Sequence, residues 1–181
     1  RDRDQVGRNG RQRVAQQRLS ASVAEWRAKP LPSVMLEDMQ LYAAGKPLEQ
    51  CAALGPMFHD RVSDSAGLLV RGFVDSQLAA LREAPLGHVA LRHFTDGATS
   101  TLLLARSGNV TLTLVAMDGR SFAARPAPVC ANFSAIESAE RILAGTAVAE
   151  LVRRRPSGSR DDALFREPVQ LQPGMAIRRD A

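Results

Sequence analysis

The stretch HVALRHFTDGATSTLLLARSGNVTLTLVAM, residues 88–117, decides the fold of this chain. Apolar residues recur in it at about every second position, which is the period of a β-strand. Two short turn sequences, TDGAT at 95–99 and SG at 107–108, divide the stretch into three strands. A DG turn then precedes a fourth short strand that we predict over 121–124. We therefore expect an antiparallel β-meander over about 88–124.

The chain before this meander is predicted to be helical, because apolar residues recur there every three or four positions. This spacing predicts helices over 11–29, 34–46, 48–59 and 65–84. Pro30 and Pro32 end the first of them. The last segment also fits a strand followed by a short helix, since its two glycines weaken a helix. We favour the helix.

After the meander, the sequence predicts one helix and a β-hairpin. Residues 134–137 (SAIE) have the form of a capping box, and an apolar stripe runs from there to an arginine run at 153–155. We expect a helix over 134–154 that packs on one face of the sheet. The sequence over 166–180 predicts two strands joined at 173–174, which form a C-terminal β-hairpin. The fold class is therefore α+β.

The charge of the chain is concentrated at its amino end. The first 29 residues hold eight basic and three acidic side chains, which gives +5, the net charge of the whole chain. We predict that residues 1–30 form a basic, partly flexible helical arm and that residues 31–181 form a single α+β domain. A basic segment of this kind attracts anionic partners without shaping a fold.

Several classes of protein are disfavoured by what the sequence lacks. It contains no glycine-rich phosphate loop, no GxSxG nucleophile motif and no HExxH metal motif. Cys51 and Cys130 form neither a CxxC pair nor a zinc-ligand set, and we expect two reduced thiols in a cytoplasmic protein. No apolar run approaches the length of a membrane span. We predict no cofactor and no metal, and expect any anchor or signal to lie before Arg1.

Two groups of reactive side chains remain as candidates for chemistry. His88, His93 and Asp96 lie close in sequence, but the histidines are five residues apart, which places them on opposite faces of a strand. Cys51 and His59 are two helical turns apart, but a Gly-Pro pair interrupts the helix between them. We therefore predict no catalytic residue.

We expect a non-enzymatic regulatory or assembly module that binds a protein partner, or a second copy, through the basic arm and an exposed helix or sheet surface. The predicted partner-binding residues are Leu19, Val23, Trp26, Arg11, Arg13 and Arg18. One alternative is nucleic-acid binding through the arm and a predicted anion-binding cluster of Arg153, Arg154 and Arg155. Another alternative is a small-molecule-binding or catalytic domain with a pocket near His93.

Overall fold

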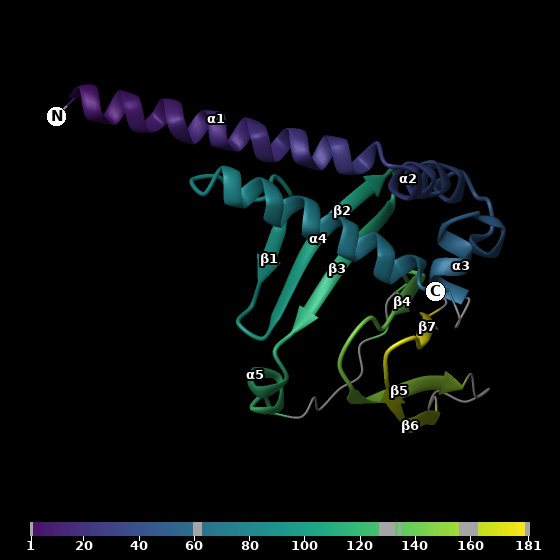
Figure 1. Ribbon diagram of the computed structural model, residues 1–181. Helices are drawn as coiled ribbons and strands as arrows, with labels where there is room; N and C mark the ends of the chain where they lie inside the picture. The colour runs from purple at the N-terminus through teal and green to yellow at the C-terminus, as the bar shows by residue number, and fades with distance from the viewer. Residues whose placement is uncertain (1, 60–62, 127–132, 134, 156–162, 180–181) are drawn as a thin grey trace. The chain divides into compact units, whose positions relative to one another are not determined.

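The computed structural model describes residues 2–59, 63–126, 133, 135–155 and 163–179 (Figure 1). Its helices and antiparallel strands confirm the α+β class. The chain divides into two compact units. The helix–sheet unit comprises Arg1–Pro56 and Gly67–Pro126, and the hairpin unit comprises Met57–Ala66 and Ala127–Ala181.

The amino-terminal half is helical, as predicted. Its elements are α1 (Asp2–Arg27), α2 (Pro30–Ala43), the 3-10 helix η1 (Leu48–Gln50), α3 (Leu54–His59) and α4 (Ser65–Glu83). The segment that also fitted a strand is thus helix α4. Pro30 ends the preceding helix and also begins α2, where its missing N–H is not needed for a helical hydrogen bond.

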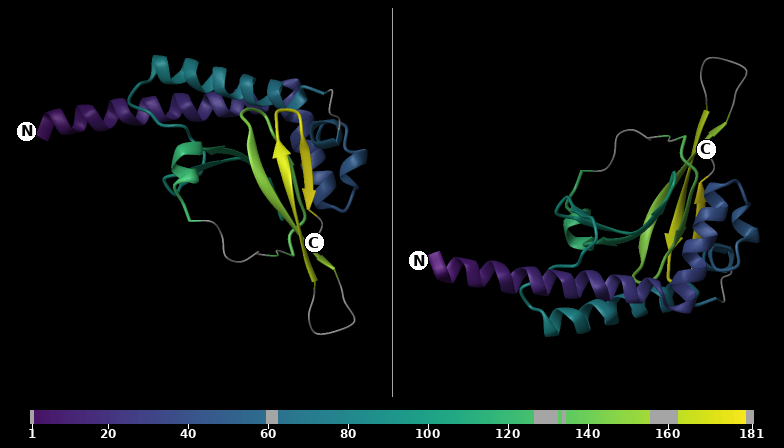
Figure 2. Two further views of the ribbon diagram at one scale, coloured as in Figure 1. Left: turned by 90° about the horizontal axis from the view of Figure 1, so that it is seen from below. Right: turned by 90° about the horizontal axis from the view of Figure 1, so that it is seen from above.

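Helices α1 and α4 lie side by side (Figure 2), and they contribute Leu19, Val23, Trp26, Leu69 and Phe73 to the core of the helix–sheet unit. Trp26 of α1 meets Phe73 of α4 edge to face, with ring centroids 5.1 Å apart. Beside this aromatic pair, the Gln77 amide donates to the Ser22 hydroxyl at 3.2 Å. The Arg27 guanidinium donates to the Leu104 carbonyl at 3.1 Å, which ties α1 to the sheet.

The predicted meander forms the sheet of this unit, with strand order β1-β2-β3 (Figure 1). Its strands are β1 (His93–Thr95), β2 (Thr99–Ser107) and β3 (Val110–Met117), all antiparallel. The first strand is shorter than predicted, because β1 begins at His93. A bulge in β2 at Leu103–Ala105 leaves the alternation of β3 unbroken.

The predicted fourth strand over 121–124 is wrong, because a short helix, α5 (Gly119–Ala123), occupies this segment. The cause is local: the Asp118 carboxylate accepts the Arg120 N–H at 3.1 Å and thereby caps the helix.

The predicted helix over 134–154 is also wrong. The segment contains strands β4 (Ser138–Arg141) and β5 (Ala147–Arg155), with Gly145 at φ 80° between them. The Glu137 carboxylate accepts from Arg178, 41 residues away, at 2.7 Å. Ser134 lies outside the described residues.

Strands β4 and β5 form the first arm of one long hairpin. β5 pairs with β6 (Ala163–Leu171), and β4 pairs with β7 (Ala176–Arg179). Two hydrogen bonds of 2.9 Å join the ladders, from Ile142 N–H to the Met175 carbonyl and from Gly174 N–H to the Ile142 carbonyl. The C-terminal β-hairpin is thus confirmed in a longer form. The turn predicted at 173–174 is a break within its second arm, not its tip.

Candidate partner-binding site

The apolar residues predicted to dock a partner belong to the core of the helix–sheet unit. Leu19, Val23 and Trp26 are all buried, and Trp26 is only 1% exposed. Trp26 meets Phe73 of α4 in the same chain, and Leu19 lies against Gly87, in the segment after α4. In this conformation they offer no surface to a second molecule.

The three predicted arginines on α1 do not share one face. Arg11 and Arg18 are two helical turns apart, and both line a groove beside α4. Arg13 is exposed but does not line this groove, because two residues correspond to a rotation of about 200° from Arg11. The structure therefore brings Arg11 and Arg18 together and leaves Arg13 on the far side of the helix.

The groove has a volume of about 330 Å³ and an apolar lining. Its main apolar side chains are Val14 of α1 and Leu86, just after α4, which are 52% and 60% exposed. Glu83 is its one acidic lining residue. The full lining set is Gly10, Arg11, Val14, Ala15, Arg18, Glu83, Ala84, Pro85 and Leu86. Val14 and Leu86 thus give the groove an apolar lining beside the Arg11 and Arg18 side chains.

Side-chain and steric contacts fix the two walls of the groove. The Gln16 side chain donates to the His88 carbonyl at 3.1 Å and accepts the His88 N–H at 3.3 Å. Gly87 packs so closely on α1 that an added Cβ would lie 2.3 Å from the Leu19 Cδ1 atom. The same Cβ would lie 3.2 Å from the Ala15 carbonyl oxygen, so the close approach of this segment to α1 favours glycine at position 87.

The arginines predicted to bind an anion do not lie at the end of a helix, as was expected. Arg153, Arg154 and Arg155 form the end of strand β5 rather than the last turn of a helix. No helix dipole therefore acts on these three side chains from their own element. Arg153 is exposed.

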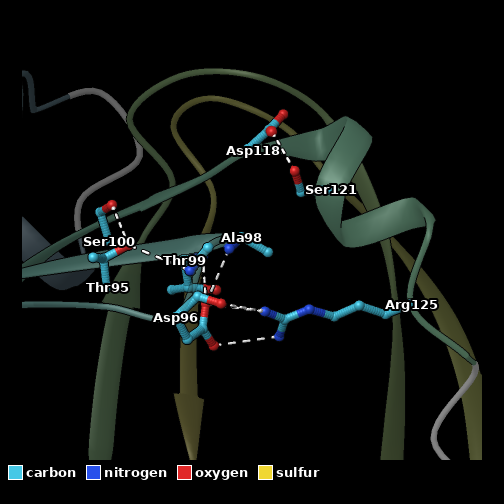
Figure 3. Close-up of polar contacts among 9 residues, drawn as sticks. Thr95, Asp96, Ala98, Thr99, Ser100, Asp118, Ser121 and Arg125 are labelled. Atoms are coloured by element: carbon cyan, nitrogen blue, oxygen red, sulfur yellow. Dashed lines mark hydrogen bonds and ion pairs between the residues drawn. The ribbon is translucent and has the colours of Figure 1, made fainter.

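A polar network holds the far end of the sheet (Figure 3). The Asp96 carboxylate accepts the N–H groups of Ala98 and Thr99 at 3.1 and 2.8 Å, which closes the predicted turn between β1 and β2. Arg125, which follows α5, forms an ion pair with Asp96 at 3.0 Å. The Arg125 hydrogen bond and the two N–H donors lower the pKa of Asp96 from 3.8 to about 2. Asp96 thus anchors the turn between β1 and β2 to the segment after α5.

This network predicts that part of the stability is lost in acid. Because the folded-state pKa of Asp96, about 2, lies below the ordinary 3.8, its stabilising effect is complete above the ordinary value. The effect is lost as the pH falls through the folded-state value. We expect Arg125→Gln to lower the melting temperature at neutral pH and to differ little from wild type near pH 2. Calorimetry over this pH range measures the difference, with exposed Arg92→Gln as control. A difference independent of pH would contradict the assignment.

The other reactive groups do not form a site among the described residues. His88 follows α4 and His93 lies on β1, both exposed, while Asp96 is bound to Arg125. Burial raises the pKa of the Cys51 thiol, and Asp38 raises it further, so this thiol is a poor nucleophile. No group of three or more potential metal ligands occurs in the described part of the chain. Nor is any helix there both long and apolar enough to cross a membrane.

No protein-family model, curated protein or solved structure matches this chain. Sequence reasoning identified Arg11 and Arg18 but missed Leu86, whose position opposite α1 depends on how α4 ends.

Proposed function

We propose that the chain is a non-enzymatic regulatory or assembly module that binds a protein segment in the groove between α1 and α4. The observation that carries this proposal is an exposed apolar groove bordered by two arginines on one helix face. The segment it fits has an acidic side chain next to one or two apolar side chains. We place this function in the cytoplasm, the reducing compartment expected from the cysteines.

The charge at the groove supports an acidic partner. Arg18 forms no ion pair or hydrogen bond with the described part of the chain, so its guanidinium is available to a carboxylate. Glu83 is the only lining residue of opposite sign, which leaves the groove basic. An arginine binds a carboxylate through two parallel N–H groups, which gives direction as well as affinity.

The size of the groove supports a short segment rather than a large ligand. A volume of about 330 Å³ lies at the lower end of the range for small binding sites. Val14 and Leu86 supply apolar contact on opposite walls. A partner held by so few groups binds with modest affinity, as regulatory contacts do.

A peptide-display experiment tests the proposal. A random peptide library is selected on the full chain, and the affinity of the enriched peptides is then measured for Arg18→Glu and Arg13→Glu. We expect enriched peptides to combine Asp or Glu with large apolar residues. Arg18→Glu should weaken their binding at least about tenfold, because it removes a cation at the groove and adds an anion. Arg13→Glu, an identical change of charge on the far side of α1, should have little effect.

Two results would contradict the proposal. One is equal binding of the enriched peptides to both variants and to wild type. The other is binding of DNA or RNA duplexes that falls steeply with salt and is weakened equally by both variants, because phosphate contacts respond to total charge rather than to one face of the helix. That result would favour the nucleic-acid alternative.

A further inference from the structure

One edge of the three-stranded sheet lacks the features that keep strand edges apart. Strand β3, VTLTLVAM, has no charged residue and no proline along its eight positions. All the other described strands of four residues or more carry at least one charged side chain, and β6 also contains Pro168. Proteins normally place charges, prolines or bulges on open edges to prevent pairing with another chain.

The opposite edge of the same sheet is protected in this way. Strand β1 has only three residues, with Arg92 before it and the Asp96–Arg125 ion pair after it. In the described part of the chain, β2 is the only strand that pairs with β3. Within the helix–sheet unit, the sheet therefore has one blocked edge and one edge without a strand partner, so association through β3 would stop at two copies.

One hydrogen bond shows which backbone N–H and carbonyl groups of β3 have no partner in β2. The Asp118 N–H donates to the Ala98 carbonyl at 2.8 Å, so the backbone of residue 118 points toward β2. Because successive residues of a strand alternate in direction, the even-numbered residues of β3 also point toward β2. The odd-numbered ones, Thr111, Thr113, Val115 and Met117, direct their N–H and carbonyl groups to the open edge.

We infer that β3 pairs with β3 of a second copy of this chain, antiparallel about a two-fold axis at Leu114. This register sets Thr113 opposite Val115 of the second copy and Thr111 opposite Met117, so all four free residues gain a hydrogen-bonding partner. This inference is independent of the proposed groove function.

Two observations favour a second copy over an unrelated strand. The uncharged strand meets itself without the like-charge repulsion that a two-fold axis would impose on any charged residue. The pairing also extends a row of side chains that includes exposed Phe94 and Val115. Phe94, Thr101 and Val115 lie in register across the three strands, and Phe94 is 67% exposed. In the dimer this row continues into the second copy, which covers part of Val115.

The first test is the mass of the full chain in solution, by analytical ultracentrifugation over a concentration series. We expect association to twice the 19.6 kDa of one chain. Thr113→Lys should keep the protein monomeric, because it places two like charges at the dimer axis. Thr113→Pro should do the same, because it removes an edge N–H that β2 does not use. The control is Thr95→Lys, the same change on β1, which should leave the dimer intact. A monomer at every concentration, or dimers of both Thr113 variants, would overturn the inference.

The second test establishes the register. In the proposed dimer, Leu114 faces Leu114 of the second copy in a non-hydrogen-bonded pair, whose Cα separation suits a disulfide. Leu114→Cys should therefore give a reducible dimer on mild oxidation. Leu112→Cys is the matched control, because its two copies would lie about 13 Å apart along the strands. The wild-type chain controls for Cys51 and Cys130. A cross-link at residue 112, or none at residue 114, would contradict this register.

Discussion

Replacing Trp26 with alanine is expected to lower the free energy of unfolding by about 4 kcal/mol. The side chain is 1% exposed and contacts Phe73 edge to face, so its removal leaves a large cavity between α1 and α4. The surrounding helices close such a cavity only in part. Because a domain of this size is stable by about 5–15 kcal/mol, the loss would be a large share of the total.

Urea unfolding followed by far-UV circular dichroism measures this effect, since the variant lacks the chain's only tryptophan. Trp26→Phe should lose clearly less, because it keeps an aromatic ring opposite Phe73. Val14→Ala is the exposed control on the same helix and should change stability little. A loss below about 1 kcal/mol for Trp26→Ala would mean that α1 does not pack on α4 as the structure has it.

The apolar stripe of α1 illustrates how far sequence reasoning extends. Leu19, Val23 and Trp26 were predicted to bind a partner, and the structure buries all three within the chain itself. Which surface covers that face depends on α4, some 50 residues further along the chain. The pattern therefore predicted a contact but not whether its partner is the same chain or another. The groove was missed for the same reason, because Val14 and Leu86 meet only through that packing.

The segment 134–154 shows a different limit. Short runs of alanine and valine fit a period of two as well as a helical period, and the apparent capping box favoured a helix. The outcome was decided by pairing with β6 and β7 and by the Glu137–Arg178 ion pair. These partners lie beyond the reach of local patterns. The meander over 88–117 was predicted better, since its strands are joined by short turns whose sequences fix the pairing.

Asp38→Ala is expected to cost about 3 kcal/mol, because Asp38 is a buried carboxylate that serves another segment's backbone. It lies on α2 and is 3% exposed. One of its oxygens accepts the N–H groups of Ala53 and Leu54, at 2.5 and 3.1 Å. These groups stand at the start of α3, where a helix has no internal partners for its N–H groups. Asp38 thus caps α3 from a different helix.

The cost arises from what the substitution leaves behind. Alanine removes the acceptor, so two buried N–H groups lose their partner in a site that water does not readily enter. Asp38→Asn keeps a carbonyl oxygen of the same reach and should lose only about 1 kcal/mol, since it gives up the charge but not the acceptor. Urea unfolding of both variants gives the two values, and amide hydrogen exchange at Ala53 and Leu54 should accelerate far more in the alanine variant.

Equal losses for alanine and asparagine would indicate that the charge, rather than the acceptor, holds the start of α3. Unchanged exchange at both amides would show that Asp38 does not cap that helix, because an N–H group deprived of its only buried acceptor exchanges through smaller openings of the fold.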